Sequence, residues 1–250
     1  MKSAIYIPAY NAAKTLPKVF SRIPADVLER VEEVFVVDNC STDRTSEVVQ
    51  EWAERIPKLR VYRNPTNLGY GGSQKFAYRH CIERGYDHVV MLHGDAQYAP
   101  ELVAHILGRV ESGEYDLVFG SRISGHPLQG GMPVIRYVGN RFLTTFQNLL
   151  LSQKLSEYHS GYRAYSVKAL ASLPFERLSN DYHFDTEIII LLINAGFRLG
   201  EQPIPTHYGD EKNYVNVWKY GSDVMVTTFS FWLHRTRLRH SRNWSRILDG

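Results

Sequence analysis

The first half of the chain alternates short apolar runs with longer amphipathic stretches. The short runs are rich in aliphatic and β-branched residues, which is typical of buried strands, and the longer stretches suit helices. The expected strands span residues 4–8, 31–37, 59–62, 88–92 and 117–120. The expected helices span residues 12–21, 45–55 and 100–110, together with one that a turn over residues 67–72 opens and that runs to residue 84. Ser41 or Thr42 is the expected cap of the helix over 45–55.

Strands that alternate with helices of about a dozen residues predict βαβ units. The expected fold is therefore α/β, with a mainly parallel central sheet flanked by helices. In open sheets of this kind the ligand lies beyond the carboxyl ends of the strands. The polar residues at 8–11, 38–39 and 93–97 follow the first, second and fourth expected strands, so they are the first candidates for a binding site.

The second half of the chain continues the alternation less regularly. A loop over residues 122–133 is followed by an expected helix over 136–151, a strand-like stretch over 158–165, a helix over 185–195, a strand over 198–203 and a terminal helix. A length of 250 residues suits one substantial core. We expect a single domain with halves at residues 1–120 and 121–235 and a basic tail at 236–250.

Composition narrows the function classes without choosing among them. Hydrophobic residues make up 44% and charged residues 22% of the chain, as in ordinary globular proteins. A net charge of +3 gives no indication of a nucleic-acid partner. Two cysteines form no disulfide framework, and the first residues do not read as a signal peptide. A cytoplasmic protein is the expectation.

Polar motifs occur in an order that resembles a known family. They are Ile7-Pro8-Ala9-Tyr10-Asn11, Val36-Val37-Asp38-Asn39-Cys40-Ser41-Thr42-Asp43, Asn67-Leu68-Gly69-Tyr70-Gly71, the loop containing Asp95, Gly120-Ser121-Arg122 and Ser160-Gly161-Tyr162-Arg163. The ordered set resembles the family 2 glycosyltransferases of GT-A fold, and among them the dolichyl-phosphate mannose synthase-like group, over about residues 3–210. The resemblance implies inverting transfer of a sugar from a nucleotide-sugar donor, bound by residues 1–120, to an acceptor bound by the remainder.

The resemblance places the donor nucleotide at the ends of the first two strands. The carboxylate that matches Asp38 accepts hydrogen bonds from the nucleobase in similar enzymes, and residues that match Pro8 and Tyr10, beside Asn11, line the base and ribose pocket. Asp38 is also a residue type that caps a turn into a following helix. Gly69 is expected to allow a tight turn and close helix packing beside the donor.

The loop that holds His93, Asp95 and Gln97 is the expected metal site. A diphosphate leaving group benefits from a divalent cation that acts as a Lewis acid. Relatives carry Asp-x-Asp-x-Gln here, so the resemblance implies Mn²⁺ or Mg²⁺ on Asp95 and Gln97. His93 replaces the first Asp. It is either a further ligand, which would favour Mn²⁺, or a donor to the diphosphate while Asp95 alone holds the metal.

Arginines after the fifth strand are candidates for binding an acceptor phosphate. Arg122 follows the strand, and Arg136 and Asn140 share one face of the next helix at i and i+4. In the dolichyl-phosphate enzymes matching residues hold the acceptor's phosphate, and guanidinium groups suit that role. The alternative is a pair of surface salt bridges.

A carboxylate near the start of the helix at 185–195 is the candidate general base for a hydroxyl acceptor, with Asp185 the first choice and Glu187 the second. A phosphate acceptor is already an anion and needs no base. Asp185 also suits the N-cap of that helix. In relatives a mobile loop with a basic residue closes over the diphosphate, and Lys212 is the matching candidate; a solvated loop is the alternative.

The C-terminal stretch combines aromatic residues with arginines. Trp218, Phe229 and Trp232 lie among small apolar residues, and Arg235 and Arg237 follow them. This pattern favours a helix that lies on an anionic membrane surface, and a core-packing helix with a basic tail is the alternative.

The sequence therefore predicts an inverting, metal-dependent glycosyltransferase that uses a UDP- or GDP-sugar. Its preferred acceptor is a polyprenyl phosphate at the cytosolic membrane face. One alternative is a family 2 enzyme that acts on a soluble or glycan hydroxyl. A second alternative is a nucleotide-sugar-binding protein without catalysis, and a sugar nucleotidyltransferase ranks low because no Gly-rich basic loop follows the first strand.

Overall fold

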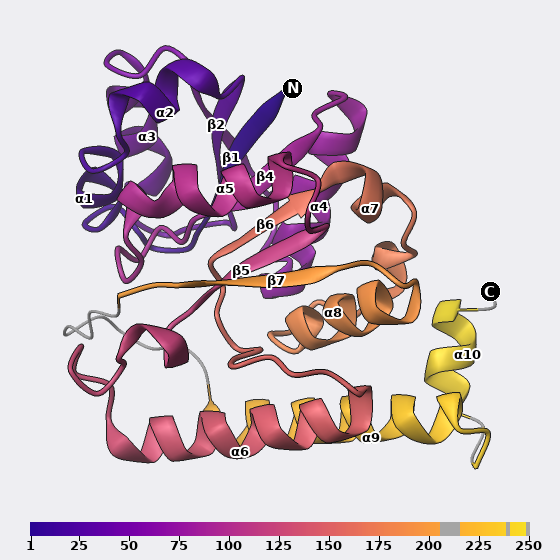
Figure 1. The fold of residues 1–250 in the computed structure, drawn as a ribbon. Coiled ribbons are helices and arrows are strands. Elements are labelled where there is room, and N and C mark those ends of the chain that lie inside the picture. Colours follow the sequence, from indigo (N-terminus) through magenta and orange to yellow (C-terminus); the bar gives the residue numbers. More distant parts are fainter. Residues whose placement is uncertain (206–215, 239–240, 249–250) are drawn as a thin grey trace.

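The computed structural model of the protein describes residues 1–205, 216–238 and 241–248. A central β-sheet forms the middle layer of the fold. In the described residues the sheet has seven strands in the order β3-β2-β1-β4-β6-β5-β7 (Figure 1). The strands are β1 Ser3–Ala9, β2 Glu33–Asp38, β3 Leu59–Arg63, β4 His88–Met91, β5 Leu117–Ser121, β6 Arg163–Ser166 and β7 Leu199–Pro203. All neighbours pair in parallel except β6, which runs antiparallel to β4 and β5.

Helices cover both faces of the sheet. The α-helices are α1 Leu16–Phe20, α2 Ala25–Arg30, α3 Thr45–Ala53, α4 Gly69–Glu83, α5 Val103–Glu111, α6 Val134–Leu151, α7 Val167–Ala171, α8 Phe184–Asn194, α9 Val217–Arg235 and α10 Arg242–Leu248. Short 3-10 turns lie at Pro100–Leu102, Ile123–Gly125 and Phe175–Arg177.

Each strand contributes to two separate cores because successive side chains point to opposite faces. On β1, Ile5 and Ile7 pack with residues of α1, α2, α3 and α5. Their neighbours Ala4 and Tyr6 pack on the other face with residues of α4, α7 and α8. A strand buried on both faces is continuously apolar, which is why these strands were recognisable in the sequence.

The expected α/β fold with a mainly parallel sheet is confirmed, and some boundaries were wrong. The helix expected over 12–21 begins only at Leu16, because Ala12 and Thr15 form a turn before it. The strand-like stretch over 158–165 is a strand only from Arg163 onward. In the segment before it, the Gly161 N–H bonds to the hydroxyl of Tyr98 instead of a neighbouring strand.

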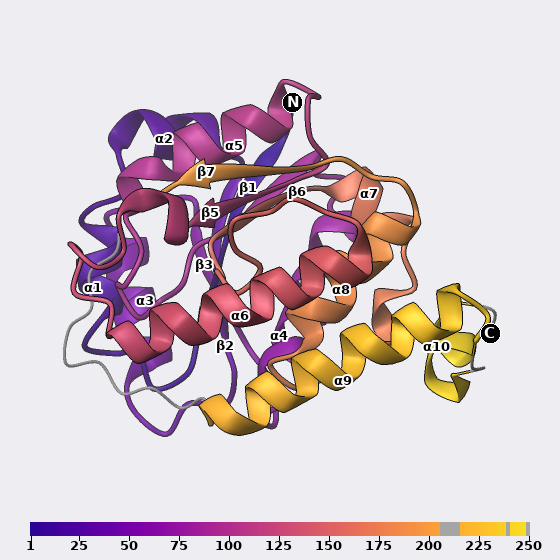
Figure 2. The same cartoon turned by 60° about the horizontal axis from the view of Figure 1, so that its bottom comes forward.

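Helices α6 and α9 form an outer layer at one side of the domain. They lie side by side below the sheet in Figure 1, with α8 between them and the strands. Turning the molecule brings the pair to the front, as Figure 2 shows. Among the described residues no helix is both long and apolar enough to cross a bilayer.

Candidate active site

Three loops meet at one edge of the sheet, where adjacent strands end. Strand β1 lies between β2 and β4, and Ala9 pairs in register with Asp38. Each of the three loops contains a non-glycine residue with positive φ: Asn11 at 52°, Cys40 at 62° and Ala96 at 63°. Such backbone is costly and concentrates at functional sites, so this edge is the candidate active site.

Asp38 is fully buried at the end of β2. Its Oδ1 accepts a hydrogen bond of 2.8 Å from the Ser41 N–H, and its Oδ2 accepts one from the Ser46 hydroxyl. The Arg63 guanidinium lies 3.8 Å from Oδ2. The turn-capping interaction is thus present in the structure. The base-binding role of Asp38 stays a prediction.

The loop after β1 lies beside Asp38. Pro8 is partly buried, and Tyr10 is exposed. Asn11 connects this loop to the loop after β2 by two hydrogen bonds. Its Oδ1 accepts one of 2.9 Å from the Thr42 N–H, and its backbone N–H donates one of 2.9 Å to the Ser41 hydroxyl. The expectation that Ser41 or Thr42 caps α3 was wrong, because the N-cap position is Arg44.

The glycines at 69–72 pack the start of α4 against the loop before α8. A Cβ atom on Gly71 would lie 2.6 Å from the Ser179 carbonyl oxygen and 2.8 Å from the Phe184 Cβ. Gly69 has φ +76°, and a Cβ there would overlap Asn180. The expectation of a tight turn and close packing is confirmed. This contact carries Tyr70, on the first turn of α4, toward the helix that holds Asp185.

The expected metal loop lies at the end of β4. His93 Nδ1 and Asp95 Oδ2 are 4.0 Å apart, and the Asp95 side chain is 39% exposed. Asp95 Oδ1 accepts a hydrogen bond of 3.0 Å from the Gln97 N–H. This bond closes a tight turn in which the central residue, Ala96, has a left-handed backbone conformation. Burial lowers the pKa of His93, and this effect exceeds the rise that the negative charge of Asp95 causes. The lowered pKa keeps the imidazole neutral and able to act as a ligand.

His93 packs directly on the backbone of Gly161. Its Nε2 is 3.3 Å from the Tyr70 hydroxyl, and its ring also contacts Tyr98 edge-on at 5.4 Å between centroids. A Cβ atom on Gly161 would overlap the imidazole, with Cε1 at 2.7 Å. The His93 ring therefore occupies the space that a side chain at position 161 would fill.

We expect Gly161→Ala to lower the free energy of unfolding by about 1–3 kcal/mol, because the added methyl group displaces the His93 ring from a packed position. Urea unfolding measures the change. Gly108→Ala in α5 is the matched control: nothing lies within 4 Å of its Cβ position, and the helix gains about 0.5–1 kcal/mol. Equal effects of the two substitutions would contradict this account of the site.

Asp185 forms the centre of a buried polar cluster. Its Oδ1 lies 3.0 Å from Nη1 of Arg163 and accepts a hydrogen bond of 2.9 Å from the Gln74 amide. Its Oδ2 accepts a hydrogen bond of 3.1 Å from the Tyr70 hydroxyl. Burial raises the pKa of Tyr70, and the negative charge of Asp185 adds to this, so the phenol stays a donor. The alternative that Asp185 is the N-cap of α8 was wrong, because His183 holds that position.

Glu187, the second candidate base, has a structural partner. It is buried, and its Oε2 accepts 2.7 Å from the Ser179 N–H. It therefore fixes the loop that packs on Gly71.

Arg122 forms a buried ion pair with Glu157. The carboxylate of Glu157 is fully buried and accepts a hydrogen bond of 2.8 Å from Nε of Arg122. It accepts further hydrogen bonds from Nη2 and from the backbone N–H of Arg122. Asn140 of α6 donates another hydrogen bond of 2.8 Å to it. Burial raises the pKa of Glu157, but the Arg122 charge and these hydrogen bonds outweigh burial and lower it. Arg122 thus forms the salt bridge that was the alternative to phosphate binding, but the pair is largely buried and not at the surface. Arg136 is exposed on the first turn of α6.

Helix α9 reaches the same cluster through a histidine. Nη2 of Arg122 donates 3.0 Å to the His159 carbonyl oxygen, and Nδ1 of His159 is 2.9 Å from the Tyr220 hydroxyl. Burial lowers the pKa of His159 to about 4, so the imidazole is neutral at pH 7. Arg122 is thus connected by hydrogen bonds to both α6 and α9.

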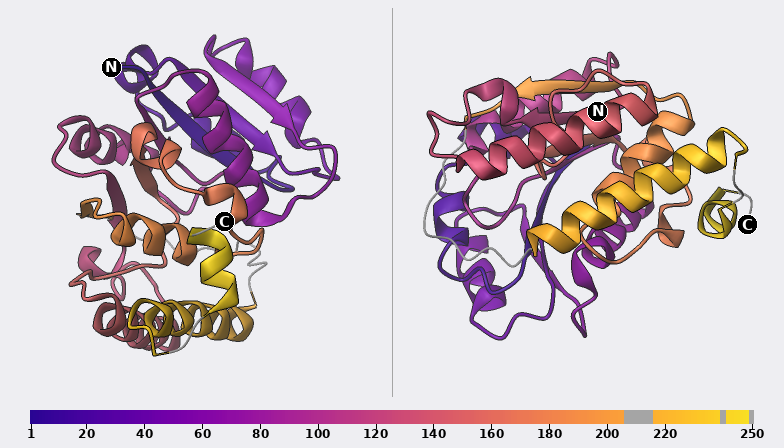
Figure 3. Two further views of the ribbon diagram at one scale, coloured as in Figure 1. Left: turned by 90° about the vertical axis from the view of Figure 1, so that its right-hand side faces the viewer. Right: turned by 90° about the horizontal axis from the view of Figure 1, so that it is seen from below.

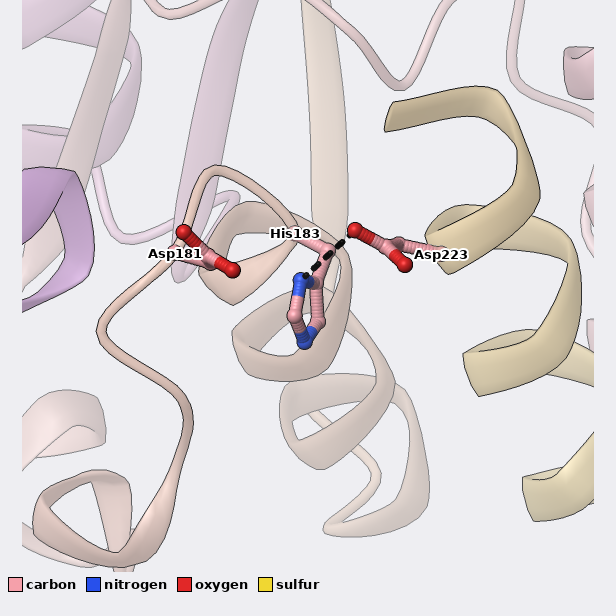
Figure 4. A group of neighbouring side chains, drawn as sticks. All are labelled: Asp181, His183 and Asp223. Carbon is pink, nitrogen blue, oxygen red and sulfur yellow. Dashed lines mark ion pairs between the residues drawn. The ribbon is translucent and has the colours of Figure 1, made fainter. Parts of the chain in front are cut away.

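A second group of potential ligands lies between α8 and α9. The group consists of Asp181, His183 and Asp223 (Figure 4). Each side chain offers one ligand atom, and these three atoms lie within 4.8 Å of one another. The Lys219 ammonium donates 3.0 Å to Asp181 and 2.7 Å to Asp223, so a cation of the protein itself already bridges the two carboxylates. Neither carboxylate needs a metal ion for charge compensation.

The structure brings together most of the predicted residues. Lys212 lies outside the described residues. Sequence reasoning missed the partners that hold the others in place, namely Tyr70, Gln74, Glu157, His159, Arg163 and Tyr220. Arg163 and Tyr70 stood within recognised motifs, but their roles depend on contacts between segments far apart in the chain.

Comparison with known proteins adds a family and relatives. The family model described as glycosyl transferase family 2 matches residues 4–173. The chain is 29% identical over 205 residues to an undecaprenyl-phosphate mannosyltransferase of Micrococcus luteus, covering 82% of this chain and 83% of that protein. It is 27% identical to a UDP-N-acetylglucosamine–dolichyl-phosphate N-acetylglucosaminyltransferase of Methanococcus voltae, with coverage of 82% and 85%.

Solved structures share the fold. Mannosyl-3-phosphoglycerate synthase from Rubrobacter xylanophilus superposes with a TM-score of 0.73 at 17% identity, covering 97% of this chain and 77% of that one. Glucosyl-3-phosphoglycerate synthase from Mycobacterium tuberculosis, in complex with Mn²⁺, UDP and phosphoglyceric acid, gives 0.69 at 19% identity, with coverage of 92% and 78%. The expected GT-A fold is thereby confirmed.

Proposed function

The chain belongs to glycosyl transferase family 2, and from this premise we propose that it transfers a sugar from a UDP- or GDP-linked donor to a polyprenyl phosphate, with inversion at the anomeric carbon. The mannosyl and N-acetylglucosaminyl relatives named above act on undecaprenyl and dolichyl phosphates. One observation in this chain carries the choice of acceptor. Asp185, the candidate base, is paired with Arg163 and accepts two further hydrogen bonds.

Both oxygens of the Asp185 carboxylate are already engaged by side chains of this chain, so a proton taken from an acceptor hydroxyl would have to replace one of these contacts, the buried ion pair with Arg163 among them. A hydroxyl acceptor needs a base, since its proton must leave as the bond to the sugar forms. A phosphate oxygen attacks as an anion and needs none. The arrangement of Asp185 therefore favours a phosphate acceptor over a soluble or glycan hydroxyl.

Asp95, with Gln97 and His93, is proposed to hold Mn²⁺ or Mg²⁺. Such an ion supplies Lewis-acid stabilisation of the negative charge that develops on the leaving diphosphate. The donor set fits a divalent cation, because the exposed carboxylate of Asp95 faces a neutral imidazole 4.0 Å away. An imidazole ligand would favour Mn²⁺ over Mg²⁺.

The donor nucleotide is proposed to lie along the ends of β1 and β2. Pro8, Tyr10 and Asn11 would line the base and ribose, with Asp38 on the base and Gly69 at the edge of the site. Tyr10 is exposed at this edge, as a residue that stacks on a ligand must be in the free protein. Lys212 is proposed to close over the diphosphate.

The acceptor phosphate is proposed to bind Arg122 and Arg136. Glu157 fixes the guanidinium of Arg122 on one edge, so its orientation is set before the acceptor arrives. The exposed Arg136, one helix turn before Asn140, adds a second charge. The C-terminal helix α9 is proposed to contact the cytosolic face of the membrane that contains the acceptor.

Nucleotide release tests the proposal. The purified protein is incubated with a panel of UDP- and GDP-sugars and Mn²⁺ or Mg²⁺, with and without a polyprenyl phosphate. We expect release with one donor that the lipid stimulates, that EDTA abolishes, and that added Mn²⁺ or Mg²⁺ restores. Release that ignores the lipid would point to a hydroxyl acceptor. Absence of both release and donor binding in every combination would refute sugar transfer by this chain.

A further inference from the structure

A chain of hydrogen bonds connects the expected metal loop to the buried cluster around Asp185. His93 Nε2 lies 3.3 Å from the hydroxyl oxygen of Tyr70, and the same hydroxyl lies 3.1 Å from Oδ2 of Asp185. Tyr70 belongs to α4, Asp185 to α8, and His93 to the loop after β4. Helices α4 and α8 contact each other and lie behind α9 when the domain is viewed from below (Figure 3, right). The direction of the hydrogen bonds at Asp185 therefore determines which hydrogen bond His93 can make.

The partners of Asp185 make it an acceptor on both of its oxygens. Its Oδ1 lies 3.0 Å from the Arg163 guanidinium and accepts a hydrogen bond of 2.9 Å from the Gln74 amide. The oxygen of Gln74 accepts a hydrogen bond of 2.6 Å from the Tyr78 hydroxyl, so its NH₂ group has to face Asp185. On the other side, the Tyr70 hydroxyl donates to Oδ2. A phenol donates more strongly to a carboxylate than to a neutral imidazole, which sets this direction.

The single proton of the Tyr70 hydroxyl decides which nitrogen of His93 is protonated. Burial raises the pKa of Tyr70, so the phenol keeps its proton, and Asp185 receives the hydrogen bond. The Tyr70 oxygen is then left as an acceptor, and Nε2 of His93, which faces it, has to carry a hydrogen. A neutral imidazole has one N–H and one lone pair. The lone pair is therefore on Nδ1, the nitrogen that lies 4.0 Å from Oδ2 of Asp95.

Aromatic packing holds the His93 ring in this orientation. The ring contacts Tyr98 edge-on at 5.4 Å between centroids and Tyr70 at 5.9 Å, and Tyr70 itself stacks on Tyr182 at 5.2 Å. The distance of 4.0 Å from Nδ1 to Asp95 is too long for a hydrogen bond. It suits two ligand atoms of one divalent cation, because nitrogen and oxygen ligands each lie about 2.0–2.2 Å from such an ion.

We propose that Tyr70 and Asp185 are positioning residues that hold His93 as its Nε2–H tautomer, so that the Nδ1 lone pair is directed at the metal ion. The inference rests on the proposed function and deepens it, because it chooses between the two roles of His93. Without a hydrogen, Nδ1 cannot donate to a diphosphate, and it is free to bind a cation. A histidine that binds a metal commonly donates its other N–H to a partner that orients it. Asp185 thereby has a role other than that of a general base.

Nitrogen NMR of the imidazole rings tests the tautomer without metal, donor or acceptor. In the full chain labelled with ¹⁵N-histidine, long-range ¹H–¹⁵N correlations distinguish a protonated from an unprotonated ring nitrogen, and His93→Gln identifies the His93 signals. We expect Nε2–H in the parent chain and a mixture of both tautomers in Tyr70→Phe, which lacks the hydroxyl. Asp185→Asn should shift the proton to Nδ1. Its amide oxygen stays with Arg163, its NH₂ group donates to Tyr70, and the Tyr70 proton turns toward Nε2.

Mn²⁺ binding measures the consequence for the metal site. The titration is followed by electron paramagnetic resonance, with Mn²⁺ alone and with UDP or GDP added. Tyr70→Phe and Asp185→Asn should each weaken Mn²⁺ binding about tenfold or more. Tyr86→Phe is the matched control, because the Tyr86 hydroxyl also donates 2.9 Å to a buried carboxylate, that of Glu33 at the opposite end of the sheet. It should leave the His93 tautomer and Mn²⁺ binding unchanged. Thermal melting verifies that each variant folds.

A proton on Nδ1 of His93 in the parent chain would overturn the inference. Equal Mn²⁺ binding by Tyr70→Phe and the parent chain would do so too, as would an equal loss in Tyr86→Phe or no Mn²⁺ binding by the parent chain in any condition. Nucleotide release reports separately on the proposed function. If sugar transfer failed while the tautomer and the Mn²⁺ results held, the proposed function would be refuted and the role of Tyr70 at the metal site would stand.

Discussion

Asp95→Asn is expected to lower sugar transfer about a thousandfold or more. The substitution keeps the shape of the side chain and removes its charge. The turn is preserved, because the amide oxygen can still accept the hydrogen bond that Oδ1 takes from the Gln97 N–H. A divalent cation would lose its anionic ligand, and the charge that develops on the diphosphate would lose its stabilisation.

The measurement is the rate of nucleotide release at saturating donor and Mn²⁺, together with the melting temperature. Asp26→Asn, on an exposed position of α2, is the matched control with the same chemical change and should retain full activity. If Asp95→Asn kept activity within a few-fold of the parent chain, the metal would have to be held elsewhere. In that case a loss of activity in His93→Ala would identify the imidazole as the principal ligand.

Arg163→Met is expected to lower the free energy of unfolding by about 3–5 kcal/mol. Arg163 is fully buried, and besides its ion pair with Asp185 it donates 2.7 Å to the Ser160 carbonyl and 3.0 Å to the Tyr158 carbonyl. Methionine fills part of the volume but leaves the buried Asp185 carboxylate without its cationic partner. The cost comes from that unpaired charge more than from the lost attraction.

Urea unfolding measures the change, and a second substitution isolates its cause. Arg163→Met combined with Asp185→Asn removes both charges and should recover a large part of the lost stability. Arg198→Met is the matched control, because Arg198 is 62% exposed, lies 3.7 Å from Asp116 and should change stability by less than about 1 kcal/mol. A double variant no more stable than Arg163→Met alone would show that lost packing, and not the buried charge, sets the cost.

The architecture could be predicted from the sequence because it follows from local patterns. The strands β1, β2 and β5 are buried on both faces, so each is a continuous apolar run whatever its neighbours are. The ends of such runs locate the carboxyl edge of a parallel sheet, and for that reason the residues around Asp38 and Asp95 could be identified as candidates from the pattern alone. The glycines at 69–72 indicated a tight turn through their lack of side chains.

The limits of the sequence appear where a residue's role depends on a partner far away in the chain. Asp185 at the start of a helix looked like an N-cap or a base. The structure excludes the first role, because α8 already begins at Phe184. The contacts of Asp185 with Tyr70, Gln74 and Arg163 come from two other elements. Arg122 looked like a surface arginine or a phosphate ligand, and only the fold buries it against Glu157.

The sequence by itself thus determined the fold class, the family resemblance and the loops in which the chemistry lies, since periodicity and turn residues are properties of short segments. Tertiary structure alone decided which side chains neutralise one another and which apolar residues remain outside. Trp218 and Phe231 are both aromatic residues of α9, yet one is exposed and the other buried. That difference depends on which side of α9 packs against α6 and α8, and contacts between segments distant in sequence are not written in the pattern of any one of them.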